Sequence, residues 1–233
     1  IISPGSHCPV CGTHIKPYNN IPILSYIILC GKCRFCGARI SPRYICVEII
    51  TAITYATIYL AYPPDAYVDI IKMLLVFPIF VAIAFIDWKH WVIPDELTIS
   101  IAAVGIASAP FIAGWLALLD SFVGCTIGML LFWLIAFIGK KAFHKEALGE
   151  GDIFLIGAVG LLVGWTGTLL TIFIAALLGS IGGFIVIMFR KSKKQMENVS
   201  LIPFGPFIVA ATIITMIFGE RIIEAYLRLF QLE

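Results

Sequence analysis

Two aspartates lie at points where long apolar stretches of the chain meet polar ones. Asp87 follows a stretch that is uncharged from residue 73 onward, and Asp152 directly precedes the uncharged residues 153–189. An ionisable side chain at such a depth costs free energy, so it marks a functional site by default. Two carboxylates that share a site cannot both ionise easily, so one can take a proton from water while the other, protonated, polarises a peptide carbonyl. The pair therefore predicts the chemistry of an aspartic peptidase within a membrane.

The helix ends on which the two aspartates are expected predict different roles for them. Asp152 would open a helix, where the helix dipole favours the anion, whereas Asp87 would close one, where the dipole disfavours it. We therefore predict that Asp152 starts as the base and Asp87 as the acid, although a shared proton makes these labels interchangeable. Gly149 and Gly151 have no side chains, so backbone and substrate can approach closely beside Asp152.

Each aspartate also has a simpler interpretation when it is taken alone. Asp152 fits a helix N-cap and Asp87 fits an interfacial anchor, and only their joint placement on one membrane face favours an active site. Asp95 is the main rival; because it follows a proline and precedes a long apolar stretch, N-capping is its expected role. Glu150 lies in a predicted loop and is expected to be solvated.

Four of the seven cysteines form two C-x-x-C pairs that are separated by 21 residues. They are Cys8, Cys11, Cys33 and Cys36. Two such pairs complete a tetrahedral Zn²⁺ shell, and four sulfurs leave no open position for a substrate, so the predicted zinc is structural. Redox dithiols or disulfides are the alternative, but the odd number of cysteines argues against a simple disulfide framework.

The composition predicts the elements that must position these side chains. Of 233 residues, 61% are hydrophobic and only 13% are charged, and the mean hydropathy is +1.02. A soluble domain carries about a quarter charged residues, so the chain is expected to be an all-α polytopic membrane protein. Residues 1–43 are polar and too few to bury a sufficient core, so they are expected to need a metal for stability.

The apolar stretches predict seven membrane helices. Residues 153–189 would form a helix of roughly 55 Å, too long for a hydrocarbon core of about 30 Å, so two helices broken near residues 164–167 are expected there. The predicted spans are residues 44–62, 68–87, 97–119, 121–139, the two halves of 153–189, and 202–218. We divide the chain into a zinc domain (1–43), a membrane-embedded peptidase domain (44–220) and an amphipathic tail (221–233).

Three pairs of glycines four residues apart predict places where helices pack closely, because small residues let two backbones approach. The pairs are Gly124 with Gly128, Gly160 with Gly164, and Gly179 with Gly183. This expectation concerns packing only and implies no chemistry.

The basic residues predict an orientation. With the cysteine-rich segment in the cytosol and seven helices threaded in order, 13 of the 16 lysines and arginines face the cytosol. The positive-inside rule therefore supports this topology. Asp87 and Asp152 then lie at the same, cytosolic, membrane face, as a shared site requires.

With these motifs in place, the chain resembles the bacterial type IV prepilin peptidases, which are leader peptidase/N-methyltransferases of the G-x-G-D membrane aspartic protease class. The resemblance includes both C-x-x-C-G segments and Gly149-x-Gly151-Asp152. The matching pieces span nearly the whole chain in the family's order. They are residues 6–12, 18–22, 31–37, 40–44, 87–97, 149–152 and 202–207.

The resemblance implies a reaction, partners and cofactors. Such enzymes cleave the leader of prepilins and pseudopilins after a Gly at the cytosolic face of the inner membrane, and then methylate the new N-terminus with S-adenosylmethionine. The family's catalytic pair falls on Asp87 and Asp152, and its zinc ligands fall on the four paired cysteines. An eighth helix upstream of Ile1 is expected by the same resemblance. The expected partners are prepilin or pseudopilin substrates and membrane lipid, and no nucleic acid is expected to bind.

One departure and one alternative remain at this point. Phe154 stands where the family commonly has Lys two residues after its second aspartate, so no charge can act there. The rival class is a non-catalytic transporter whose aspartate pair carries protons or cations, because broken helices and intramembrane carboxylates also occur there. No inverted repeat is apparent in the sequence, and transport does not need a zinc-binding segment.

Overall fold

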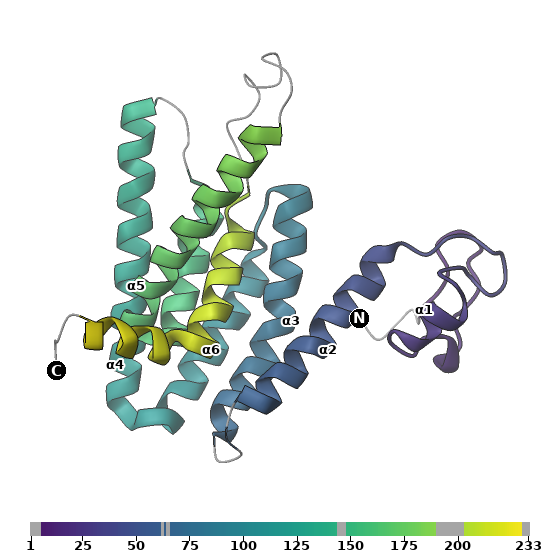
Figure 1. Cartoon of the computed structure of the whole chain (residues 1–233), viewed down its shortest axis with the longest axis horizontal. Helices are drawn as coiled ribbons and strands as arrows, with labels where there is room; N and C mark the ends of the chain where they lie inside the picture. Colours follow the sequence, from purple (N-terminus) through teal and green to yellow (C-terminus); the bar gives the residue numbers. More distant parts are fainter. Residues whose placement is uncertain (1–5, 62, 64–65, 144–147, 190–202, 230–233) are drawn as a thin grey trace. The chain divides into compact units, whose positions relative to one another are not determined.

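The described part of the chain is almost entirely helical (Figure 1). The computed structural model describes residues 6–61, 63, 66–143, 148–189 and 203–229, and among these no strand forms beyond isolated bridges. The chain divides into two compact units, residues 1–60 and 61–233. The predicted all-α class is confirmed.

The first unit joins the cysteine-rich segment to a long helix. It contains the 3-10 helix η1 (Pro17–Asn19), the short helix α1 (Leu24–Ile28) and most of α2 (Pro42–Ala61). Glu48 is the one charge in the apolar stretch that follows Tyr44, and its Oε2 accepts a hydrogen bond of 2.6 Å from the Ile23 N–H at the start of α1. This bond satisfies a half-buried carboxylate and ties α1 to α2.

The second unit is a bundle of four helical elements. They are α3 (Tyr67–His90), α4 (Asp95–Phe143), α5 (Glu150–Phe189) and α6 (Gly205–Leu229). Fully apolar side chains from these helices form its core, among them Val76, Phe80, Ile83, Ile101, Leu155, Ile156, Val159 and Ile208. The helix ends that carry Asp87 and Gly205 meet through a hydrogen bond, and Ile93 lies beside both Gly205 and Gly151, which belongs to the first turn of α5 with Asp152.

Helix α5 consists of two helices that run in opposite directions. Gly164 interrupts it with φ 71° and ψ −178°, in the region that only glycine adopts readily. A Cβ added to Gly128 would lie 3.1 Å from both Ile156 O and Thr168 Cγ2. In a straight helix, Ile156 and Thr168 would be about 18 Å apart, because twelve residues separate them. The chain therefore reverses direction between these two residues. Both ends of α5 accordingly lie at one end of the bundle (Figure 1). The predicted break near residues 164–167 is confirmed.

Helix α4 is also broken, but the predicted position of the break was wrong. We expected Asp120 to separate two spans, whereas the spans are Asp95–Ile112 and Gly114–Lys141. Gly114 has φ 64°, so the backbone turns there. A carboxylate does not by itself end a helix. Asp120 instead lies within the second span, where its carboxylate occupies the place that a Cβ on Gly164 would take.

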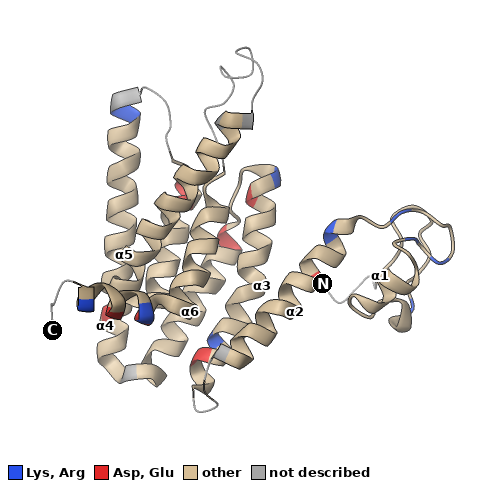
Figure 2. Cartoon of the chain, viewed as in Figure 1, with Lys and Arg blue, Asp and Glu red and all other residues tan. Residues whose placement is uncertain are grey.

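The membrane character of the chain follows from these helices. Six described helices are long and apolar enough to cross a membrane, and the reversal at Gly164 divides one of them, Glu150–Val186, into two. Among the described residues, a helical segment therefore overlaps each of the seven predicted spans. Figure 2 shows that the helices of the second unit are uncharged along most of their length and that charge gathers near their ends. Helix α6 continues to Leu229, beyond the predicted end at residue 218.

Glycine contacts explain the tightest helix packing. The backbones of Gly124 and Gly160 meet so closely that a Cβ on either residue would overlap the other helix. Gly179 instead receives the ring of Phe204, 2.8 Å from where its Cβ would be. The predicted close packing is confirmed for Gly124 and Gly160. The basic segment 190–195 and Lys145, on which the predicted orientation partly depends, lie outside the described residues.

Candidate active site and metal centre

Asp87 lies in the last turn of α3, where the chain turns back on itself. The helix ends at Trp91, which adopts a left-handed conformation (φ 60°, ψ 32°) and donates its N–H to the Asp87 carbonyl oxygen at 2.9 Å. Pro94 favours an extended conformation at the residue before it, so the helix does not continue. The side chain of Asp87 is only 6% exposed, and its Oδ2 accepts a hydrogen bond of 3.0 Å from the Gly205 N–H.

Asp152 lies in the first turn of α5 and is 8% exposed. Its Oδ2 accepts a hydrogen bond of 3.2 Å from the Gly149 N–H, and its own N–H donates to the Gly149 carbonyl oxygen at 3.2 Å. This reciprocal pair closes the Gly149–Asp152 turn at the helix N-terminus. Glu150 is exposed, as expected, but it is the first residue of α5 and not part of a loop as predicted.

The two buried carboxylates belong to one site. Their surroundings are joined through Gly205, which bonds to Asp87, and through Ile93, which lies beside both Gly205 and Gly151. Ile93 packs between the surrounding segments, since a Cβ on Gly151 would lie 3.1 Å from Ile93 Cβ and one on Gly205 would lie 3.3 Å from Ile93 Cδ1. The segments that carry Asp87, Asp152 and Gly151 therefore meet around Ile93, and a shared catalytic role for the two aspartates stays a prediction.

The rival residue Asp95 does not share this environment. It is exposed and is the first residue of α4. An exposed carboxylate at a helix start is solvated and interacts favourably with the helix dipole. Asp87 is therefore the buried acidic residue next to the turn between α3 and α4, whereas Asp95 is exposed there.

Gly205 is a site residue that sequence reasoning missed. The only signal was its position in the matched segment 202–207, to which no role was attached. Because it opens α6, its N–H points the positive end of that helix at Asp87. The predicted acid and base roles of Asp87 and Asp152 considered only the dipole of the helix that carries each residue. The N-terminus of α6 adds a further dipole at Asp87, which changes that comparison.

The two C-x-x-C pairs form turns of the same design. The N–H of Gly12 donates to Cys8 O at 2.9 Å, and the N–H of Gly37 donates to Cys33 O at 2.9 Å. Both glycines have a left-handed conformation, with φ 68° and φ 69°. Each turn is closed by an antiparallel bridge, one joining His7 with His14 and the other joining Lys32 with Arg39. The repeated geometry presents two sulfurs from each turn.

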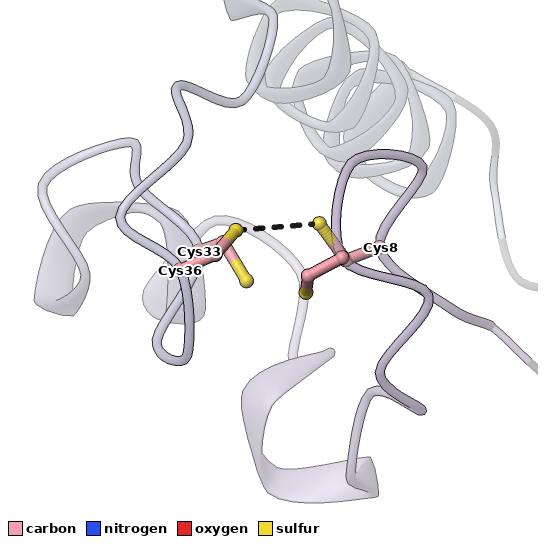
Figure 3. Close-up of side chains that lie close together, drawn as sticks. Cys8, Cys33 and Cys36 are labelled. Atoms are coloured by element: carbon pink, nitrogen blue, oxygen red, sulfur yellow. Dashed lines mark hydrogen bonds between the residues drawn. The ribbon is translucent and has the colours of Figure 1, made fainter.

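The four sulfurs converge on one point. The Sγ atoms of Cys8, Cys11, Cys33 and Cys36 all lie within 4.8 Å of one another. Figure 3 shows the thiols of Cys8, Cys33 and Cys36 facing one another, with 3.9 Å between Cys8 Sγ and Cys36 Sγ. Tetrahedral coordination by four thiolates requires such a spacing, so the cluster can hold a metal ion.

The pKa values of two of these thiols are shifted in opposite directions. A hydrogen bond with the Thr13 hydroxyl, helped by the Thr13 backbone, lowers the pKa of Cys11 from 9.0 to about 6. The Ala38 backbone N–H favours the thiolate of Cys36, but desolvation and the neighbouring sulfurs outweigh it and raise the pKa of Cys36 to about 11. Four thiolates at this spacing therefore need a cation, which would displace the remaining protons.

Comparison with known proteins places the chain in a family. The model of the bacterial peptidase A24 N-terminal domain matches residues 1–62, and that of the type IV leader peptidase family matches residues 73–186. The prepilin leader peptidase/N-methyltransferase of Pseudomonas aeruginosa is 34% identical over 229 residues, which are 98% of this chain and 76% of that protein. The chain belongs to the type IV leader peptidase family.

Other relatives in the family agree with this membership. The prepilin leader peptidase/N-methyltransferase of Myxococcus xanthus is 34% identical over 206 residues, covering 88% of this chain and 61% of that protein. The type 4 prepilin-like proteins leader peptide-processing enzyme of Escherichia coli is 33% identical over 213 residues, covering 91% and 75%. No solved structure matches the chain. The two family regions contain the four cysteines and the two buried aspartates respectively.

Proposed function

We propose that this chain is a membrane aspartic endopeptidase that cleaves the leader peptide of type IV prepilins or pseudopilins and methylates the N-terminus it exposes. Its relatives carry the name prepilin leader peptidase/N-methyltransferase over nearly the whole of this chain. Cleavage after a Gly, at the cytosolic face of the inner membrane, is the form of the reaction that the family resemblance implies.

The observation that carries the proposal is the pair of buried carboxylates contributed by α3 and α5. One carboxylate takes a proton from water, whose oxygen attacks the scissile carbonyl carbon. The other, protonated, donates to the carbonyl oxygen, and the amine accepts a proton as the C–N bond breaks. The dipoles of α5 and α3 favour Asp152 as the first base and Asp87 as the first acid, as predicted. The Gly205 N–H at the N-terminus of α6 favours the Asp87 anion, so we propose that the pair shares one proton and that either carboxylate can start as the base.

Backbone hydrogen bonds prepare the pair for this chemistry. Gly205 holds Oδ2 of Asp87 and Gly149 holds Oδ2 of Asp152. Each carboxylate is thereby held in place through one oxygen, and we propose that its other oxygen contacts water or substrate during the reaction. Positioning of this kind lowers the entropy that the reaction must lose at its transition state.

A cytosolic location for the site is consistent with the charges near it. Lys89 follows Asp87 at the end of α3, and Lys140 and Lys141 lie in the last turn of α4. Basic residues next to membrane helices are retained on the cytosolic side. We propose that the prepilin's apolar helix docks in the membrane and leaves its cleavage site level with the two aspartates.

The transporter alternative is not favoured. A relationship that covers almost the whole chain and includes both aspartates joins it to peptidases. The decisive experiment incubates the purified protein with a prepilin in detergent and follows the loss of the leader. Cleavage by the wild type, abolished in Asp87→Ala and in Asp152→Ala, is expected. Retained cleavage in both variants would rule out the aspartic mechanism.

We also propose that the four-cysteine cluster holds a structural Zn²⁺. The four sulfurs fit that ion in number, type and spacing. The ion would join two turns that are 21 residues apart in a unit too small for a large core. Metal analysis of a Cys8→Ser/Cys33→Ser variant tests this. Unchanged zinc content would remove the site.

The methyl donor that we propose is S-adenosylmethionine, which would supply its sulfonium methyl group to the new N-terminal amine. A cavity of about 420 Å³ in the first unit is our candidate for its site. This volume lies within the range of about 300–1,000 Å³ that is typical of small-molecule sites. The lining includes rings that could stack on adenine and cations that could pair with the donor's carboxylate: Tyr26, Phe35, Tyr44, Arg34 and Arg39.

Calorimetric binding of S-adenosylhomocysteine tests this site without measuring activity. Arg39→Ala should weaken binding by about tenfold if the guanidinium pairs with the ligand's carboxylate. Arg43→Ala is the matched control, because Arg43 is exposed and does not line the cavity. Equal affinity of the two variants would place the donor elsewhere.

A further inference from the structure

Gly205 contacts Asp87 across 118 residues of sequence. Its N–H donates to Asp87 Oδ2 at 3.0 Å, and both groups are buried. A Cβ at this position would lie 2.6 Å from Oδ2 and 3.1 Å from Cγ of Asp87. Real Cβ contacts are not that short, so the carboxylate can occupy its present place only beside a glycine.

The surrounding atoms leave little room for adjustment. Ile93 Cδ1 would be 3.3 Å from the same added Cβ, and Ile93 is itself only 8% exposed. Ile93 also packs against Gly151 in the turn that carries Asp152. A side chain at residue 205 would therefore displace Asp87 rather than be absorbed by a flexible neighbour, because packed interiors relax only partially.

We propose that Gly205 is a positioning residue for Asp87: its N–H holds one carboxylate oxygen, and its missing side chain sets how closely α6 approaches the aspartate pair. This inference rests on the proposed function, in which Asp87 and Asp152 are the catalytic pair. Gly205 does not act on the substrate itself. It determines where the Asp87 carboxylate stands when water and peptide are in place.

Such a role affects kcat rather than substrate binding. A displaced carboxylate still allows the prepilin helix to dock, but it is misaligned at the transition state. A misplacement of about 1 Å can cost about 100-fold in rate. A residue that only stabilised the bundle would instead lower the amount of active enzyme and leave the kinetic constants of the folded fraction unchanged.

Gly219→Ala is the matched control for Gly205→Ala. Gly219 is also buried and lies on the same helix, α6, where an added Cβ would meet Thr215 Cγ2 at 3.4 Å, an ordinary contact. The two variants thus make the same chemical change on one element. They differ in whether the new methyl group meets Asp87.

The kinetic experiment measures prepilin cleavage in detergent by the wild type, Gly205→Ala, Gly219→Ala and Asp87→Asn. We expect Gly205→Ala to lower kcat by about 100-fold with KM within about twofold of the wild type, and Gly219→Ala to keep both constants within about twofold. A kcat above half of the wild-type value in Gly205→Ala, beside an inactive Asp87→Asn, overturns the positioning role alone. Full activity of Asp87→Asn overturns the proposed function instead.

A thermal unfolding cycle keeps the inference testable even if Gly205→Ala is poorly folded. We expect Gly205→Ala to lower the melting temperature in the wild-type background and to lower it by less than half as much in an Asp87→Ala background, where the clashing carboxylate is gone. Residues in contact show such coupling, whereas independent residues add. An equal decrease in both backgrounds overturns the contact on which the proposal depends.

Discussion

The metal centre and the carboxylate site are built in opposite ways. Each half of the metal centre is a local turn, closed by a glycine N–H that bonds to a carbonyl four residues earlier. The carboxylate site takes Asp87 from one helix, Asp152 from another and its Gly205 donor from a third. Local turns can be recognised from a motif, whereas a site assembled from three helices depends on how the bundle packs.

The two sites also differ in how they accommodate charge. Cys11 and Cys36 are exposed, and a bound cation would neutralise their thiolates from within the cluster. Asp87 and Asp152 are buried and interact with helix N-termini and backbone donors instead. The proposed metal site therefore needs little beyond its four ligands. The proposed catalytic pair needs surrounding protein that holds two buried carboxylates together, which costs free energy.

The strongest test of this contrast removes one ionisable group while keeping its shape. We expect Asp87→Asn and Asp152→Asn each to lower prepilin cleavage by about 1,000-fold or more, because an amide can neither accept nor share the proton. Asp95→Asn, at the exposed start of α4, should keep cleavage within about twofold. Zinc content should not change in any of the three. A loss of activity in Asp95→Asn equal to the others would contradict the assignment.

Removal of metal ligands tests the four-cysteine cluster. We expect Cys8→Ser/Cys33→Ser to lose bound zinc to background and to expose the first unit, residues 1–60, to limited proteolysis. Cys46→Ser is the control, since Cys46 lies outside the cluster. Mass spectrometry of the fragments and metal analysis give the readout. Should the double variant resist protease as well as the wild type does, the metal is not what stabilises this unit.

A smaller effect is expected where a glycine supports Asp152 indirectly. In Gly151→Ala the new Cβ would lie 3.1 Å from Ile93 Cβ, tighter than most real contacts, and Ile93 rather than Asp87 would be its nearest neighbour. We expect kcat for prepilin cleavage to fall about tenfold, less than for Gly205→Ala. Steady-state kinetics of the two variants in parallel measure this order. The reverse order would show that Gly151, and not Gly205, is the closer support of the pair.

The smallest expected effect concerns a single hydrogen bond at the metal centre. Thr13→Val removes the hydroxyl that lies 3.3 Å from Cys11 Sγ and lowers its pKa, so the pKa of Cys11 should rise above about 6. At pH 7 fewer Cys11 thiolates would then be available, and zinc should be lost at about threefold lower chelator concentration. Thr57→Val, on α2 away from the cluster, is the control. Identical chelator curves would exclude a role for Thr13.

Several features of the fold could be predicted because they depend on length and local pattern. A stretch without charge between residues 153 and 189 is too long to cross once, so a reversal was required, and Gly164 supplies it. The predicted position of the break in α4 was wrong because it, too, depended on the local charge pattern. The charge of Asp120 predicts a boundary there, whereas the left-handed Gly114 turns the chain. Asp120 instead lies against Gly164, a contact that no local pattern indicates.

The sequence alone predicted a chemistry for both sites, since the C-x-x-C spacing and the interfacial aspartates restrict what those residues can do. Tertiary structure decided how the aspartates are held. The predicted difference between them considered the dipoles of α3 and α5, each read from its own stretch of chain. Packing adds the N-terminus of α6, whose Gly205 N–H reaches Asp87. A hydrogen bond between residues 118 positions apart depends on three-dimensional packing, and no local periodicity or spacing reports it.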